Sequence, residues 1–96
     1  MFIYKAAVIG GGAMGAEIAQ VISYSGLPVI LKEINETLAK KALAAIRRIY
    51  QGRVDKGKMT AQELDAKMSL VSISTSYDDL KEVDIAGNRK MTVLAA

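Results

Sequence analysis

The 96-residue sequence contains no cysteine, no histidine and no tryptophan, and it has a single proline and a single phenylalanine. Without cysteine the chain can form no disulfide, no thiolate nucleophile and no cysteine metal site. Without histidine it lacks the side chain that most often transfers protons near neutral pH and most often binds metals. We therefore expect no metal site and no catalytic residue of these kinds in this chain.

The composition indicates one small globular domain. A length of 96 residues suffices for one domain and not for two, and 51% hydrophobic with 24% charged residues is typical of a soluble fold. The single proline and the absence of low-complexity tracts argue against a linker or a disordered chain. Lys5 and several glycines interrupt the first apolar run, which predicts neither a signal peptide nor a membrane span, and hence a cytoplasmic protein.

The charge balance is mildly basic. Thirteen Lys and Arg residues against ten Asp and Glu residues leave a formal net charge of +3. The basic residues alternate with acids, and few aromatic residues are present to stack on bases. We therefore expect a solvated helix face rather than a nucleic-acid interface, and a phosphate-bearing small molecule suits the same charge.

Three glycines at the G-x-G-x-x-G spacing follow the first predicted strand, residues 6–10. Gly10 allows a sharp turn at the strand end, and Gly12 has no Cβ to keep a diphosphate away from the backbone. Gly15 allows the next helix to pack close to the strand. The spacing alone also fits a tight turn that binds nothing.

The residues after this bend add two features of a nucleotide site. We expect unpaired N–H groups of Gly12, Ala13 and Met14 at the helix start, whose partial positive charge attracts phosphate. A second apolar run, residues 28–31, is followed by Glu33, 18 residues after the last glycine of the motif. An acid about 20 residues downstream is suited to accept hydrogen bonds from the adenosine ribose. The pattern therefore predicts nucleotide binding.

The remaining patterns complete an α/β chain. We expect a helix that follows Gly12 and ends near residues 24–26, a second from about residue 36 to about residue 54, and a short third that ends at about residue 68. Asn35 and Thr60 are the expected N-caps of the second and third, and residues 56–58 form a turn. Further strands are expected at residues 70–74 and from residue 83, and residues 91–96 are again strand-like. These elements predict an incomplete Rossmann-type parallel sheet of three to four strands, with a helical hairpin after the second strand. We expect a half-domain at residues 1–86 and a divergent tail at residues 87–96 that could form a short strand.

Helical spacing also predicts which helix faces are buried. The apolar positions of the first helix are Met14, Ile18, Val21 and Ile22. Those of the second helix are Leu38, Ala42, Ala45, Ile46 and Ile49.

Several stretches follow the pattern of one known family. They are AVIGGGAMGAEIAQ at residues 7–20, in which Met14, Ile18 and Gln20 are more telling than the glycines, residues 28–35, the KGKMT turn at residues 56–60, and residues 77–85. Over residues 5–86 the chain resembles the L-3-hydroxyacyl-CoA dehydrogenases of fatty-acid β-oxidation, including the multifunctional type.

The resemblance implies an NAD-binding domain whose full-length relatives oxidise the 3-hydroxyl of an acyl-CoA. By position, the diphosphate would be held by Gly10, Gly12, Ala13, Met14 and Gly15, and the ribose by Glu33. Lys56 stands where a relative uses a lysine to contact CoA, although it could equally be a solvated turn residue.

The family pattern is lost at Ala86. Full-length relatives continue with a Glu and a Lys near the nicotinamide, and later with a Ser, an Asn and a His–Glu pair. In the family that His takes the proton of the hydroxyl group while the hydride leaves, and this chain has no histidine. We therefore expect a truncated NAD-binding fragment that lacks the catalytic domain and is inactive alone.

Two other functions fit the same residues. A self-associating structural or interaction domain would retain the fold without a cofactor. A shortened fourth strand would expose a sheet edge, which residues 91–96 could cover or which could pair with a second copy, and this predicts a homo-oligomer. A flavin or NADP protein could use the same turn, because Glu33 repels a 2′-phosphate but the neighbouring Lys32 offsets part of that repulsion.

Overall fold

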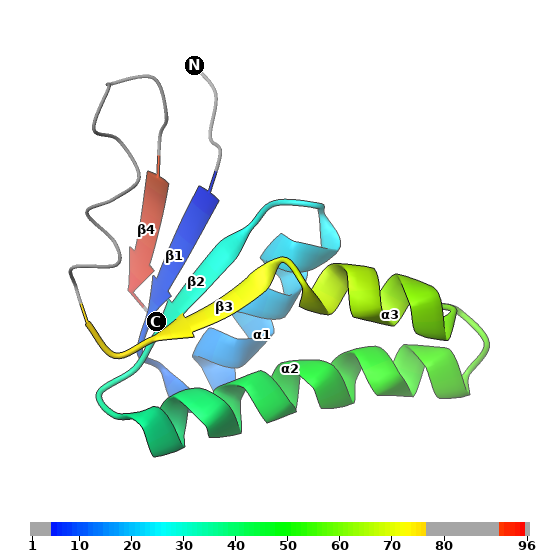
Figure 1. The fold of residues 1–96 in the computed structure, drawn as a ribbon, viewed down its shortest axis with the longest axis horizontal. Helices are drawn as coiled ribbons and strands as arrows, with labels where there is room; N and C mark the ends of the chain where they lie inside the picture. Colours follow the sequence, from blue (N-terminus) through cyan, green and yellow to red (C-terminus); the bar gives the residue numbers. More distant parts are fainter. Residues whose placement is uncertain (1–4, 77–90, 96) are drawn as a thin grey trace.

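The computed structural model describes residues 5–76 and 91–95. In these ranges four parallel strands form one sheet in the order β3-β2-β1-β4. The strands are β1 (Lys5–Ile9), β2 (Val29–Lys32), β3 (Val71–Ser74) and β4 (Met91–Ala95), and the helices are α1 (Gly12–Tyr24), α2 (Glu36–Asp55) and α3 (Ala61–Met68). Figure 1 shows α2 and α3 beside β3, with β4 at the opposite edge of the sheet. The predicted Rossmann-type α/β fold, with a helical hairpin after the second strand, is confirmed.

The core lies between the sheet and the helices. In the strand register Ala6 lies beside Val29, which lies beside Val71, and Val8 lies beside Leu31. Side chains at paired positions point to the same face of a sheet, so these residues form one apolar layer. They pack in a single cluster with residues of the helices and of the turn before α3: Ala16, Ala19, Ala42, Ile46, Tyr50, Met59 and Leu64.

The buried face of α1 agrees only in part with the predicted one. Ile18 and Ile22 are partly buried and pack against the core, as expected. Met14 and Val21 are 62% and 64% exposed, whereas the buried residues of the helix are Gly15, Ala16, Ala19, Gln20 and Ser23. Small residues face the sheet because α1 approaches β1 too closely for large side chains to fit between them. Close packing, rather than apolar periodicity, therefore decides which face of α1 is inside.

The buried face of α2 overlaps the predicted one but is shifted from it. Ala42 and Ile46 are buried as expected, and Ala45 packs against the core. The buried residues of α2 are Ala39, Ala42, Ile46 and Tyr50, while Leu38 is 38% exposed. The Tyr50 hydroxyl oxygen lies 2.6 Å from Ser23 Oγ and donates to the Gln20 carbonyl over 3.1 Å. Burial raises the pKa of this hydroxyl above its ordinary value. Tyr50 is thus a fully buried link between α1 and α2 that the sequence pattern did not predict.

The predicted helix caps are confirmed. The Asn35 side chain accepts a hydrogen bond from the Leu38 N–H over 2.9 Å. Thr60 and Glu63 form a reciprocal capping box, in which the Thr60 N–H donates to Glu63 Oε1 and the Glu63 N–H donates to Thr60 Oγ1, both over 3.0 Å. Gly57, with φ 73°, forms the turn between α2 and α3.

At the other edge of the sheet, β4 pairs with β1, with Lys5 opposite Met91 and Ile9 opposite Ala95. The strand predicted to begin at residue 83 and the turn at residues 87–90 lie outside the described residues. None of the helices within residues 5–76 has the length and hydropathy that crossing a bilayer requires.

Candidate nucleotide-binding site

Three consecutive glycines turn the chain from β1 into α1. Gly10, Gly11 and Gly12 have φ of 66°, 87° and 51°, a left-handed conformation that side-chain-bearing residues rarely adopt. The Gly10 N–H donates to the Lys32 carbonyl over 2.8 Å, which fixes the start of the bend to the end of β2. The bend therefore lies at the carboxyl ends of two adjacent parallel strands, where open α/β sheets bind ligands.

Gly11 is a residue of the bend to which the glycine spacing assigned no role. Its carbonyl accepts hydrogen bonds from the N–H groups of Met14, over 3.0 Å, and Gly15, over 3.2 Å. The expectation of an unpaired Met14 N–H was therefore wrong, because a tight first turn of α1 uses that donor. The N–H groups of Gly12 and Ala13 have no acceptor within the described residues. The uninterrupted run of three glycines at residues 10–12 was the available signal for Gly11.

Gly12 and Gly15 lack a side chain for opposite reasons. A Cβ on Gly15 would overlap the Gly10 carbonyl oxygen and would lie 3.6 Å from Val8 Cγ1. A Cβ on Gly12 would meet nothing within 4 Å, so the backbone is open to solvent there. Gly15 therefore lets α1 pack on β1, and Gly12 leaves an uncovered stretch of main chain with free donors.

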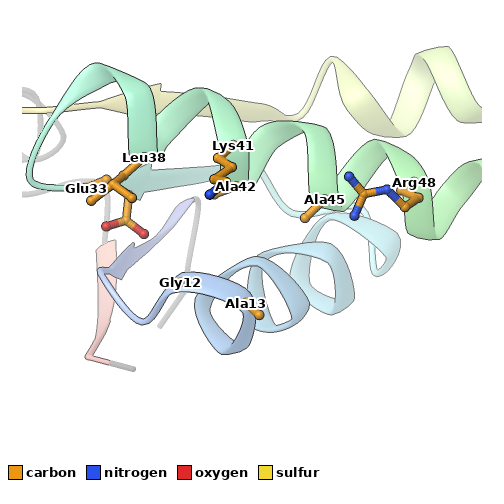
Figure 2. A pocket seen from close by; sticks show the side chains of 8 residues that line it. All are labelled: Gly12, Ala13, Glu33, Leu38, Lys41, Ala42, Ala45 and Arg48. Atoms are coloured by element: carbon orange, nitrogen blue, oxygen red, sulfur yellow. The ribbon is translucent and has the colours of Figure 1, made fainter.

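Glu33 follows β2 and is 5% exposed. Its N–H donates to the Ser74 carbonyl over 2.9 Å, which holds it at the carboxyl end of the sheet. The side chain lines a cavity of about 300 Å³ together with Gly12 and Ala13, and Figure 2 shows its carboxylate directed toward the space between α1 and α2. No hydrogen-bond or ion-pair partner of this carboxylate is found among the described residues. The structure thus brings Glu33 to the open part of the glycine bend.

One face of α2 forms the opposite wall of the cavity. Its residues are Leu38, Lys41, Ala42, Ala45 and Arg48, which recur at intervals of three or four and so share a helix face. Sequence reasoning assigned none of them to the site. Their helical spacing was the available signal, but it indicated a core stripe and a solvated basic face instead. No group of three or more acidic side chains suited to a metal ion occurs within the described ranges.

Lys56 lies apart from this cavity. It caps the carboxyl end of α2, 20 residues long, whereas Glu33 lies just before its amino end, so the two are separated by roughly 30 Å. Lys56 is exposed and lines a second hollow of about 290 Å³ with Ile49, Gly52, Arg53 and Lys58. The predicted substrate residue and the predicted cofactor residues thus belong to two separate surfaces.

Residues 5–87 match the family described as "3-hydroxyacyl-CoA dehydrogenase, NAD binding domain". The chain is 40% identical over 83 residues to the peroxisomal fatty acid β-oxidation multifunctional protein MFP2 of Arabidopsis thaliana. It is 37% identical over 83 residues to the fatty acid oxidation complex subunit alpha of Colwellia psychrerythraea. Each match covers 86% of this chain but only 11% and 12% of the relative, so the chain spans about a ninth of these proteins.

Solved structures similar to this chain include two 3-hydroxybutyryl-CoA dehydrogenases. The (S)-3-hydroxybutyryl-CoA dehydrogenase PaaH1 from Ralstonia eutropha superposes with a TM-score of 0.85 at 30% identity, covering 99% of this chain and 31% of that one. The 3-hydroxybutyryl-CoA dehydrogenase from Escherichia coli superposes with a TM-score of 0.80 at 31% identity, covering 88% of this chain and 18% of that one.

Proposed function

The chain belongs to the family of 3-hydroxyacyl-CoA dehydrogenase NAD-binding domains, and we propose that its glycine bend and Glu33 together hold NAD. One observation carries this proposal. Two free backbone donors, a stretch of backbone with no Cβ above it, and the Glu33 carboxylate, which has no partner among the described residues, line one cavity. Its volume of about 300 Å³ lies at the lower end of the range for ligand pockets.

The residues of the bend have different proposed roles. The N–H groups of Gly12 and Ala13 donate to the diphosphate, at the amino end of α1 where the helix dipole favours an anion. Gly10 supplies the turn and Gly15 the close approach of α1 to β1. Met14, whose N–H is already bonded, contributes only its exposed side chain beside the bound diphosphate.

Glu33 is proposed to select the adenosine ribose. An ionised carboxylate only accepts hydrogen bonds, and the two ribose hydroxyls are donors. This pairing favours NAD over a cofactor that carries a 2′-phosphate.

We propose that the whole protein oxidises the 3-hydroxyl of an acyl-CoA, with bound NAD accepting the hydride. The phosphates of CoA would contact Lys56, helped by the charges of Arg53 and Lys58 in the same hollow. This chain has no histidine, so the base for the hydroxyl proton would have to come from outside these 96 residues. These 96 residues alone are therefore expected to bind NADH without turnover.

Isothermal titration of the chain with NADH tests the cofactor site. We expect saturable binding that Glu33→Ala weakens about tenfold, the effect of losing a hydrogen bond to a charged group. Glu36→Ala is the matched control, because Glu36 is an exposed acid on the adjacent turn that pairs with Lys40. A folded natural chain that gives no heat with millimolar NADH would refute the proposal and favour the structural alternative.

We further propose that the chain forms a homo-oligomer in the cytoplasm. The argument for assembly is the sheet, because the outer edges of β3 and β4 have no strand partner within the described residues. A monomeric sedimentation coefficient at tens of micromolar would count against it. Fractionation of cells would test the location, since the plant relatives bear peroxisomal and glyoxysomal names.

A further inference from the structure

The cavity contains two cations to which the NAD contacts proposed above give no role. Lys41 and Arg48 line it together with Glu33. Neither forms an ion pair within the described residues, where Lys40 with Glu36 is the ion pair found. Figure 2 shows the three charged side chains in a row, with Glu33 at one end, Arg48 at the other and Lys41 between them. The cavity thus offers a ligand one negative and two positive groups.

The two cations differ in their distance from the ribose end. Side chains on a helix lean toward its amino terminus, which for Lys41 is the end near Glu33, and Figure 2 shows Lys41 as the nearer of the two cations to Glu33. Arg48 is seven residues farther along α2, which is roughly 10 Å. Lys41 is therefore the cation that a group on the adenosine ribose would meet first. Lys32 precedes Glu33 in the chain but is not among the residues that line the cavity.

We propose that Lys41 is a second determinant of cofactor choice. A 2′-phosphate carries a charge of about −1.5 to −2 at neutral pH and would lie beside the Glu33 carboxylate, which repels it. The Lys41 ammonium offsets that repulsion and donates to the phosphate oxygens. The cavity therefore accepts NADPH as well as NADH, with a smaller preference for NADH than an acid alone would impose. This inference rests on the proposed NAD site.

Binding of NADH and NADPH to three proteins tests the inference: the natural chain, Lys41→Met and Arg48→Met. Methionine keeps much of the length of either side chain and removes the charge. Lys41→Met should weaken NADPH roughly tenfold, as expected for losing one charge-assisted contact, and change NADH less than about twofold. Arg48→Met is the matched control and should leave the ratio of the two affinities unchanged.

Two smaller nucleotides test whether the effect of Lys41→Met is limited to the 2′ position of the ribose. Adenosine 2′,5′-bisphosphate and 5′-AMP differ only by the 2′-phosphate, so Lys41→Met should weaken the first and spare the second. Both variants replace exposed residues and should melt within a few degrees of the natural chain, which separates a local effect from unfolding.

The outcomes distinguish this inference from the proposed function. If NADH binds the natural chain but NADPH does not, or if Lys41→Met leaves the ratio unchanged, Lys41 has no part in cofactor choice while the NAD site stands. Equal losses of NADPH affinity in Lys41→Met and Arg48→Met would indicate a general positive field and overturn the assignment to Lys41. If NADH itself did not bind, both the proposed NAD site and this inference would be refuted.

Discussion

The glycine bend at residues 10–15 and the helical hairpin of α2 and α3 are held in place by different means. In the bend, the hydrogen bonds join main-chain atoms, and two donors are left without an acceptor among the described residues. In the hairpin, side chains complete the structure: the capping box closes α3, and the Arg53 guanidinium lies 4.6 Å from the centre of the Tyr24 ring. In the hairpin, side chains thus bind the backbone donors at the helix start. In the glycine bend, where we propose the cofactor, two backbone donors have no such partner.

Gly15→Ala should break the bend most severely. The new Cβ would overlap the Gly10 carbonyl, which is backbone and cannot move without displacing the end of β1. We expect a loss of about 3 kcal/mol of unfolding free energy, the top of the usual range for overpacking. A domain of this size has few kcal/mol to lose, so the variant should be largely unfolded in urea melts that the natural chain resists.

Gly52→Ala is the control for that substitution. Gly52 lies within α2, and a Cβ there would meet nothing within 4 Å. Alanine is the better helix former, so we expect a gain of about 0.5–1 kcal/mol. Equal stability of the two variants would show that α1 does not need its close approach to β1.

Gly12→Ala should separate binding from folding. The left-handed backbone there makes alanine unfavourable by about 1–2 kcal/mol, but the Cβ would point into open space. NADH affinity should fall at least tenfold, since the methyl group would occupy the position of the diphosphate. Titration calorimetry together with thermal melting measures both effects. Unchanged NADH affinity in a folded variant would mean that the diphosphate does not lie over Gly12.

The sequence predicted the main-chain features of both regions well because they depend on local chemistry. Glycine spacing located the bend, and Asn35 and Thr60 located two helix starts, since each requires only a few neighbouring residues. The cavity wall contributed by α2 could not be predicted in the same way. Lys41 and Arg48 belong to the site only because α1 and α2 lie side by side, and their spacing fits a solvated face equally well.

The buried helix faces were predicted only in part, for a related reason. Apolar periodicity assumes that large residues face the core, but Gly15 sets α1 so close to β1 that Ala16 and Ala19 fill the space. Tyr50 was missed because a tyrosine, with an apolar ring and a polar hydroxyl, can be either buried or exposed. Its burial is favourable here because Ser23 and Gln20 on α1 bind the hydroxyl. Packing distance and polar partners are tertiary properties that a single helix does not encode.

Tyr50→Phe should weaken the contact between α2 and α1 and spare the cofactor. The substitution removes the hydroxyl that lies 2.6 Å from Ser23 Oγ and donates to the Gln20 carbonyl. We expect a loss of about 1–2 kcal/mol of unfolding free energy, because buried partner groups are left with fewer hydrogen bonds. NADH affinity should change less than about twofold, since the contacts of this hydroxyl within the described residues are with Ser23 and Gln20 and not with the glycine bend. A large loss of affinity would mean that the two regions are coupled.

Glu63→Gln should give the smallest effect and only in acid. The backbone N–H of Thr60, donating to the Glu63 carboxylate, lowers the pKa of that carboxyl below its ordinary value, and the Thr60 side chain adds to this. A group whose pKa is lower in the folded state stabilises the protein above its unfolded value of about 4.3. That contribution disappears as the pH falls through the lower, folded value. Glutamine keeps an acceptor for the cap but does not titrate, so the melting temperature of the variant should fall less between pH 6 and about pH 3 than that of the natural chain.

Because Glu63 is solvent-exposed and only one charge is involved, the difference should be a degree or two, and NADH binding at neutral pH should be unaffected. An identical acid profile for the two proteins would mean that the charge of the Glu63 carboxylate contributes nothing to the stability of the capping box.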